Sequence, residues 1–295
     1  MPSGAATREG VCIVVPAYDE EEAIEACLRE LRAVMGELDR ESELIVINDG
    51  STDRTAELAR AAGVRVIDLP ENRGYGAALK TGIEAARFET IVITDADGTY
   101  PAKEIPALLE RAEQYDMVVG ARTGANVAIP FARRPAKWFL TKLASYLAGR
   151  PIPDLNSGMR VLKRRHVQRF EHVLPSGFSF TASITLASLC SDLLVAYHPI
   201  DYLERTGQSK IRAAHALEFT ILVLRTIVYF NPLKVFLPLG AVFFAGGTAK
   251  FIYDLFIGNL SETAVLGFLG GTLLWAVGLL SDQIARAGLG GGRRS

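Results

Sequence analysis

Residues 91–101 read Ile-Val-Ile-Thr-Asp-Ala-Asp-Gly-Thr-Tyr-Pro, an apolar run that passes directly into an acidic loop. Short runs of β-branched residues are typical of strands that are covered on both faces of a sheet. Gly98 permits a turn after the run, and Pro101 suits the first turn of a following helix. The stretch therefore predicts a buried strand, a polar loop and a helix, in that order.

The same order recurs through the first 120 residues. Repeated alternation of strands and helices favours an α/β fold with a parallel sheet, in which ligands bind beyond the carboxyl ends of the strands. The predicted strands are Val11–Val15, Leu44–Ile47, Val64–Ile67, Ile91–Ile93 and Met117–Val119, and the predicted helices are Glu20–Leu38, Thr52–Ala62, Gly76–Arg87 and Pro101–Ala112.

The last third of the chain has the composition of a membrane segment. Val235–Ala249 and Ala264–Ser281 carry no charge, and a membrane span needs roughly 20 apolar residues. The first segment reaches that length only if Lys250 extends toward the interface or pairs with Asp254, one helical turn on. The alternative is a pair of buried core helices in a soluble protein.

The distribution of basic residues predicts the orientation of these two segments. The connection Gly258–Thr263 has no Lys or Arg, whereas both flanks are basic, so the positive-inside bias predicts a hairpin with both ends in the cytoplasm. The first ten residues lack an apolar signal core, which agrees with a first half that lies on the cytoplasmic face of the cell membrane in a multi-pass protein. The basic flanking residues are Arg225, Lys234, Arg286, Arg293 and Arg294.

Four segments are expected. They are a catalytic domain at residues 1–210, an interfacial amphipathic helix at 211–232, a two-helix transmembrane hairpin at 233–287 and a flexible tail at 288–295. The formal net charge of -1 and the lack of a basic arm predict no nucleic-acid partner. The three cysteines are scattered without metal-ligand spacing, so we expect thiols without a redox or metal role.

Asp95 and Asp97 are the candidate metal ligands. Two carboxylates at the end of a strand can converge on one hard cation, and Mg²⁺ or Mn²⁺ prefers oxygen ligands and bridges to substrate phosphates. The alternative for these two residues is a solvated turn with an acidic cap.

Polar residues also follow the other predicted strands. We expect Asp19 to cap the first helix and Ser51 or Thr52 to cap the second, which leaves Asp49 able to accept hydrogen bonds from a base or ribose. Gly74 and Gly76 permit an anion to approach the start of a helix, although Leu79 excludes a standard phosphate-binding loop.

Together these motifs resemble the inverting nucleotide-sugar glycosyltransferases of family 2, which have the glycosyltransferase-A (Rossmann-like) fold. The nearest likeness is to the polyprenyl-phosphate hexosyltransferases, such as dolichol-phosphate mannose synthase and the bactoprenol glucosyltransferases. The resemblance covers Val11 to about Lys210, and the hairpin matches the bactoprenol type. It implies transfer of a hexose from a UDP- or GDP-sugar to undecaprenyl or dolichyl phosphate, with Mg²⁺ or Mn²⁺.

The resemblance also implies roles for individual residues. The segment Asp154–Arg160 resembles a motif near the acceptor, where Asp154 is the candidate for a base or an orienting group. Nucleotide binding is implied for Pro16, Tyr18, Glu20, Asp49, Gly74 and Asp95, and metal binding for Asp95 and Asp97. Catalytic roles are implied for Asp97, Asp154, Arg205 and Lys210, and lipid-phosphate binding for Arg122, Arg133, Arg134 and Ser157.

Departures from the family pattern leave some roles open. Asn48 replaces a more common Asp, and Thr99 stands where some relatives have a Gln beside the metal. Ile184–Leu189 is predicted to be a buried amphipathic helix, with a lid or acceptor groove as the alternative. The rival functions are a sugar-nucleotide nucleotidyltransferase and a non-catalytic membrane scaffold. A homo-oligomer is left open.

Overall fold

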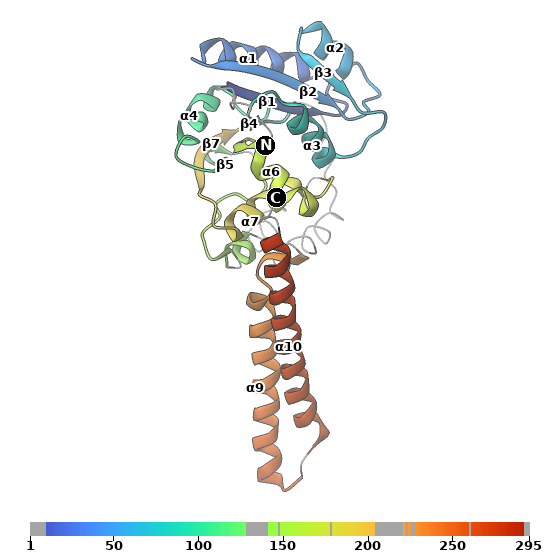
Figure 1. The fold of residues 1–295 in the computed structure, drawn as a ribbon, viewed down its shortest axis with the longest axis vertical. Helices are drawn as coiled ribbons and strands as arrows, with labels where there is room; N and C mark the ends of the chain where they lie inside the picture. Colours follow the sequence, from blue (N-terminus) through green and yellow to red (C-terminus); the bar gives the residue numbers. More distant parts are fainter. Residues whose placement is uncertain are drawn as a thin grey trace. The chain divides into compact units, whose positions relative to one another are not determined.

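The computed structural model describes residues 10–127, 141–146, 148–177, 179–203, 221, 224–225, 228–259 and 261–291. The chain forms two compact units, one made of residues 1–146 and 150–222 and the other of residues 147–149 and 223–295. The first is an α/β domain and the second is a helical hairpin (Figure 1).

A seven-stranded sheet in the order β3-β2-β1-β4-β6-β5-β7 forms the centre of the first unit. All five predicted strands are present. The strands are β1 Gly10–Ala17, β2 Glu41–Asn48, β3 Arg65–Asp68, β4 Thr90–Ile93, β5 Met117–Val127, β6 Arg160–Lys163 and β7 Val195–Tyr202. The helices of this unit are α1 Ile24–Glu37, α2 Thr55–Ala61, α3 Tyr75–Ala85, η1 Ala102–Glu104, α4 Ile105–Arg111, α6 Arg164–Phe170, η3 Glu171–Val173 and α7 Phe180–Cys190.

The sheet is mixed, so the prediction of a parallel sheet is wrong in part. Strands β1 to β4 are parallel to one another, but β6 runs antiparallel to both β4 and β5. Ile93, the last residue of β4, pairs with Arg160, the first residue of β6. The segment that precedes β6 therefore lies at the same edge as the carboxyl ends of the parallel strands, where ligands bind in such sheets.

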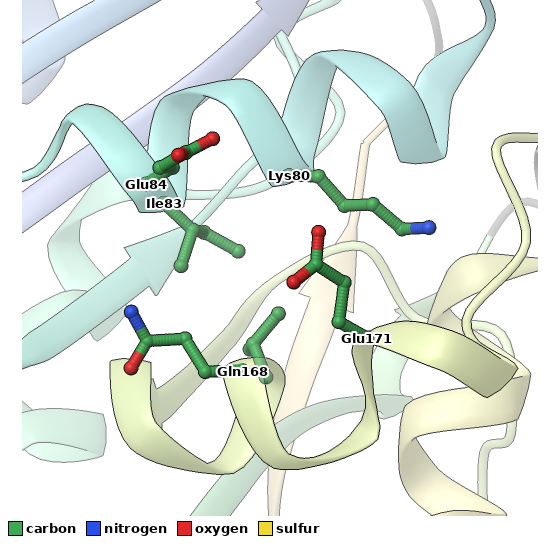
Figure 2. A pocket seen from close by; sticks show the side chains of 6 residues that line it. Lys80, Ile83, Glu84, Gln168 and Glu171 are labelled. Atoms are coloured by element: carbon green, nitrogen blue, oxygen red, sulfur yellow. The ribbon is translucent and has the colours of Figure 1, made fainter.

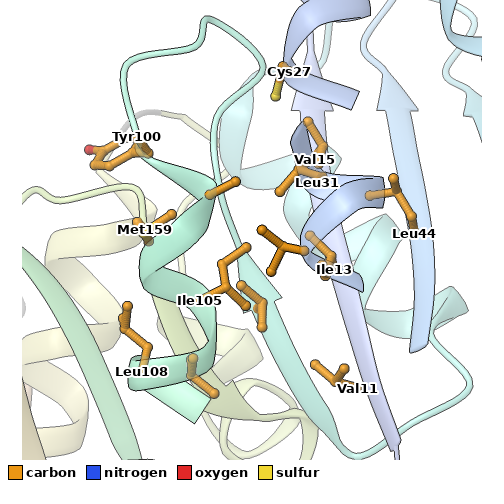
Figure 3. Close-up of a cluster of buried hydrophobic side chains, with 14 of the residues drawn as sticks. Val11, Ile13, Val15, Cys27, Leu31, Leu44, Tyr100, Ile105, Leu108 and Met159 are labelled. Atoms are coloured by element: carbon orange, nitrogen blue, oxygen red, sulfur yellow. The ribbon is translucent and has the colours of Figure 1, made fainter. Parts of the chain in front are cut away.

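Helices cover both faces of the sheet. On one face, Ile13 and Val15 of β1 pack in a buried cluster with Leu31 of α1 and Leu108 of α4 (Figure 3). On the other face, α3 lies so close that a Cβ at Gly82 would meet the side chains of Val14 and Ile47. Each fully buried aliphatic side chain contributes about 1.5–3 kcal/mol by leaving water. This burial explains why the strands are almost uninterrupted apolar runs.

The first strand is longer than predicted, since it continues through Pro16 to Ala17. Pro16 pairs in register with Ile47 of β2, whereas pairing with β4 ends at Val14. The Val14 carbonyl accepts a hydrogen bond from Thr94 on the β4 side, and residues two apart face the same side of a strand. The N–H that proline lacks would therefore point toward a side where the ladder has already ended, which is where a strand tolerates proline.

Beyond residue 120, strands β6 and β7 and helices α6 and η3 were not predicted, and helix α7 was misjudged. β6 has only four residues, and β7 contains Pro199, which weakens a strand prediction but is tolerated because β7 is an edge strand. The prediction that Ile184–Leu189 is amphipathic is wrong, since every residue of α7 from Phe180 to Leu189 is buried. A helix covered on all sides shows no apolar stripe in its sequence.

The second unit contains the predicted hairpin, formed by α9 (Leu233–Ile257) and α10 (Glu262–Gly291). Both helices are long and apolar enough to cross a membrane, yet only 11% and 17% of their most apolar windows are buried. Core helices of a soluble protein would be mostly buried, so this exposure argues against that alternative. Lys250 and Asp254 form the predicted ion pair. α10 continues past the predicted start of the tail at residue 288.

Close approach of glycines holds the two hairpin helices together. A Cβ at Gly267 of α10 would lie 2.6 Å from the Cα atom of Gly247 of α9. We expect Gly267→Ala to separate the helices and to destabilise the hairpin by about 1–3 kcal/mol, the usual cost of overpacking. Gly246→Ala is the matched control, because a Cβ there has no neighbour within 4 Å. Unfolding of both variants in mixed detergent micelles measures the difference, and equal stabilities would contradict this packing.

Candidate active site

The loops that follow β1 and β2 are tied to each other at the carboxyl edge of the sheet. The Asp19 amide donates to Ser51 Oγ at 3.0 Å, and the Thr52 amide donates to Asp19 Oδ1 at 2.8 Å. The Glu20 amide donates to Thr55 Oγ1 at 2.8 Å. The predicted capping roles of Asp19, Ser51 and Thr52 are therefore wrong, because these groups bind across the two loops. Pro16 is buried here, and Tyr18 and Glu20 are half-buried.

Both carboxylate oxygens of Asp49 accept hydrogen bonds from the backbone of this chain. Its Oδ1 accepts from the Arg73 amide at 2.8 Å and its Oδ2 accepts from the Gly74 amide at 2.9 Å. The side chain is almost completely buried. Asp49 therefore fixes the loop that leads into α3, and a direct contact with the nucleotide stays a prediction.

The two glycines at the start of α3 accommodate another part of this chain. A Cβ at Gly74 would lie 2.7 Å from the Ser176 carbonyl oxygen, and one at Gly76 would lie 2.3 Å from that of Pro175. The Ala77 amide already donates to the Ser176 carbonyl at 3.0 Å. A backbone carbonyl therefore holds the Ala77 amide, and anion binding at Gly74 and Gly76 stays a prediction.

Asp97 is held by the residue two positions further on. Its Oδ1 accepts a hydrogen bond from the Thr99 amide at 3.1 Å and from Thr99 Oγ1 at 2.6 Å. Asp97 is 5% exposed and Thr99 is fully buried. Thr99 thus orients the carboxylate of Asp97.

Asp95 accepts a hydrogen bond from a tyrosine hydroxyl at its carboxylate and another from a cysteine thiol at its backbone carbonyl. Tyr75 Oη donates to Asp95 Oδ1 at 2.9 Å, and Cys27 Sγ donates to the Asp95 carbonyl at 3.6 Å. Burial and the neighbouring Asp95 carboxylate raise the pKa of Tyr75 well above its ordinary value. Burial and the charge of Asp97 raise the pKa of Cys27 to about 12, so both groups are neutral donors at physiological pH.

The donor set at this edge fits a hard divalent cation. Asp95 and Asp97 supply carboxylate oxygens, and Mg²⁺ or Mn²⁺ is commonly held by one or two carboxylates together with substrate phosphates and water. Among the residues that the structure describes, no group of three or more His, Cys, Asp or Glu side chains is placed to hold a metal ion. A site here would therefore be completed by the substrate.

Arg122 and Asp154 form a buried two-pronged ion pair. Arg122 Nε donates to Asp154 Oδ2 at 2.7 Å, and Nη2 donates to Oδ1 at 2.9 Å. The Arg122 amide donates to Oδ2 as well, and the guanidinium lies over the ring of Tyr202. Asp154 is fully buried, so its observed role is to orient Arg122. A role as a base would require this pair to separate.

Ser157 and Arg160 hold the segment that precedes β6 in place. Ser157 is fully buried and its hydroxyl donates to the Gly120 carbonyl, a position that argues against contact with a lipid phosphate. Arg160, also fully buried, donates to the carbonyls of Ser157 and Thr181 and to Thr185 Oγ1. The segment is thereby anchored to α7.

Other predicted residues lie outside the described residues. They are Arg133, Arg134, Arg205 and Lys210, together with most of the interfacial helix expected at 211–232. A separate pocket lies between α3 and the α6–η3 segment, lined by Lys80, Glu84 and Glu171 among others (Figure 2). Its volume of about 80 Å³ is well below the roughly 300 Å³ of small-molecule sites, so it is not a candidate for a nucleotide sugar.

Comparison with known proteins gives two family matches. Residues 12–170 match Glycosyl transferase family 2, and residues 231–287 match the GtrB C-terminal hairpin. The chain is 33% identical over 207 residues to a dolichyl-phosphate hexose transferase of Haloferax volcanii. This alignment covers 70% of this chain and 88% of that protein. It is 30% identical over 310 aligned positions to an undecaprenyl-phosphate 4-deoxy-4-formamido-L-arabinose transferase of Pseudomonas aeruginosa, with coverages of 94% and 85%.

Solved structures show the same fold. A crystal structure of glucosyl-3-phosphoglycerate synthase from Mycobacterium tuberculosis, in complex with Mn²⁺, UDP-glucose and phosphoglyceric acid, matches with a TM-score of 0.59. The sequence identity is 20%, and the match covers 74% of this chain and 80% of that one. At this identity the likeness concerns the fold alone.

Proposed function

The chain belongs to glycosyl transferase family 2, and on this basis we propose that it transfers a hexose from a nucleotide sugar to a polyprenyl phosphate. It is a glycosyltransferase with a glycosyltransferase-A domain and a GtrB-type hairpin. The named relatives act on dolichyl and undecaprenyl phosphate, and the hairpin suits a lipid acceptor. The product is a polyprenyl-phosphate sugar for later glycan assembly.

One short segment carries the proposal. Within Asp154–Gly158, Asp154 pairs with Arg122, and Gly158 packs directly against the carboxylate of Asp95. A single anchored loop thus binds Arg122 at its first residue and contacts one of the two candidate metal ligands four residues further on. This is the juxtaposition that transfer to an anionic acceptor requires, because the donor diphosphate and the acceptor phosphate must both be neutralised.

On the donor side, Asp95 and Asp97 would hold Mg²⁺ or Mn²⁺ against the diphosphate of a UDP- or GDP-hexose. A bound divalent cation supplies stabilisation of the negative charge that develops on the leaving group. Thr99 keeps the carboxylate of Asp97 oriented through its two hydrogen bonds. Pro16, Tyr18 and Glu20 would bind the nucleoside at the carboxyl end of β1, while Asp49 and Gly74 shape the adjoining loop.

On the acceptor side, Arg122 would draw the lipid phosphate toward the sugar. A phosphate monoester has a second pKa near 6, so its attacking oxygen is already largely ionised at about neutral pH. A strong base is therefore unnecessary, and Asp154 serves by holding Arg122. A single in-line displacement then inverts the anomeric carbon. Arg133, Arg134, Arg205 and Lys210 stay proposed phosphate ligands, and Ser157 contributes only through the loop.

The hairpin would place this chemistry at the cytoplasmic face of the cell membrane. Lys234 lies at the start of α9 and Arg286 lies near the end of α10, whereas the connection between the two helices has no basic residue. The positive-inside bias supports a catalytic domain in the cytoplasm. The limits 1–210, 211–232, 233–287 and 288–295 remain our proposed division of the chain.

A screen of nucleotide sugars tests this function. Membranes that contain the protein are incubated with one labelled UDP- or GDP-hexose at a time, with polyprenyl phosphate and Mg²⁺ or Mn²⁺. We expect label in the lipid fraction with one donor, and loss of transfer with EDTA. Release of pyrophosphate from a nucleoside triphosphate with a sugar phosphate, without any labelled lipid, would favour a nucleotidyltransferase instead.

A further inference from the structure

We propose that Tyr75 and Gly158 act as a clamp that fixes the carboxylate of Asp95 for cation binding. This inference rests on the metal site of the proposed function and goes beyond it, because it assigns two positioning residues from different parts of the chain. Tyr75 comes from the start of α3, and Gly158 comes from the segment before β6.

The Tyr75 side of the clamp is rigid because the start of α3 is anchored from two directions. Asp49 accepts hydrogen bonds from the amides of Arg73 and Gly74, directly before Tyr75. Ser176 accepts the Ala77 amide, two residues after it. Gly74 has a φ of 93°, a conformation that glycine adopts without strain. The Tyr75 hydroxyl is therefore delivered to Asp95 Oδ1 from a fixed backbone.

The Gly158 side of the clamp is a close backbone approach. A Cβ at Gly158 would lie 2.6 Å from Asp95 Oδ2 and 2.8 Å from Oδ1, so the Gly158 backbone blocks movement of the carboxylate on this side. The Gly158 amide donates to Tyr100 Oη at 2.6 Å. The Gly120 amide donates to the Met159 carbonyl at 3.0 Å, which ties the next residue to β5. The Gly158 backbone cannot move away from Asp95 without breaking these hydrogen bonds.

Together the two contacts limit rotation of the Asp95 side chain. A metal ligand that is already oriented loses less conformational entropy on binding, and hydrogen-bonded neighbours of metal ligands commonly set affinity in this way. Asp97 has its own support from Thr99, so the clamp acts on one ligand only. Its effect is thus on cation affinity, with the fold and the metal-free nucleotide affinity retained.

Mn²⁺ binding to the full-length protein in detergent tests the clamp. Loss of the free Mn²⁺ signal in electron paramagnetic resonance gives the Kd, with UDP and GDP each present in turn. We expect the Kd to rise about 10- to 100-fold for Gly158→Ala and about tenfold for Tyr75→Phe, the usual range for groups that support a ligand. The matched controls are Gly36→Ala, whose Cβ meets nothing within 4 Å, and Tyr115→Phe, which packs against the core elsewhere.

The outcomes separate the clamp from the metal site itself. Weaker Mn²⁺ binding by both variants, with control affinities and an unchanged Tm, supports the clamp. Wild-type affinities in both variants overturn it, even where Asp97→Asn abolishes binding and the metal site stands. Wild-type Mn²⁺ binding by Asp97→Asn overturns the metal site and the clamp together. If Gly158→Ala fails to fold, Tyr75→Phe decides alone, because it removes a single oxygen atom.

Discussion

Asp97→Asn is expected to reduce hexose transfer by at least about 100-fold, the usual cost of removing one preorganised charge-stabilising group. Asparagine has the shape of aspartate and keeps an oxygen that can accept the two hydrogen bonds from Thr99. The loop should therefore keep its conformation while one of the two candidate metal ligands loses its charge. Transfer of labelled hexose to polyprenyl phosphate, measured at saturating Mg²⁺ or Mn²⁺, gives the comparison.

Asp39→Asn is the matched control for this prediction. Asp39 is exposed in the connection between α1 and β2, at the opposite edge of the sheet, and its replacement changes the charge of the chain by the same amount. We expect wild-type transfer from this variant. Full activity of Asp97→Asn, with an unchanged dependence on the cation, would remove Asp97 from the site.

Asp154→Ala is expected to destabilise the catalytic domain by about 3–5 kcal/mol, the cost of leaving a buried charge without its partner. Asp154 is fully buried and the Arg122 side chain is 15% exposed, so solvent screens this pair only weakly. Urea unfolding in detergent micelles, followed by circular dichroism, measures the free energy of unfolding. Arg122→Met alone should lower the free energy of unfolding by a similar amount, since it leaves the buried Asp154 carboxylate without this cation.

The double variant distinguishes an ion pair from two independent contributions. Removal of both charges leaves neither group stranded, so the Asp154→Ala/Arg122→Met variant should be more stable than the sum of the two single changes predicts. Simple additivity would contradict the pair. A pH profile of Asp154→Asn adds a test of mechanism. An orienting role lowers the rate without changing the profile, whereas loss of an acidic limb would identify Asp154 as a base.

Local patterns predicted much of the fold because strands, helices and membrane spans are recorded in neighbouring residues. The five predicted strands and the hairpin follow from β-branched runs and from uncharged segments of sufficient length. Strand β6 was not predicted because four residues give too little periodicity. Helix α7 was misjudged because a helix that is buried on all sides has no polar face. Helix starts were placed too early, at Glu20 and Thr52 instead of Ile24 and Thr55, because the polar groups of Asp19 and Thr52 bind across two loops.

The candidate metal ligands could be predicted for the same reason, since Asp95 and Asp97 lie together after one strand. The hydrogen-bond partners of each site residue could not be predicted from the sequence. Asp49 was expected to meet a ligand, and the structure shows that it also holds the backbone before α3. Asp154 was the candidate for a base or an orienting group, and in the structure it holds Arg122.

Sequence by itself determined the order of the first five strands and the helices between them, the acidic pair at a strand end and the apolar hairpin. Only the tertiary structure decided that β6 returns antiparallel and brings Gly158 against Asp95, while α3 brings Tyr75 to the same carboxylate. The reason is that propensity and periodicity act between neighbours in the chain. Hydrogen bonds and close packing join residues that meet only when the sheet forms.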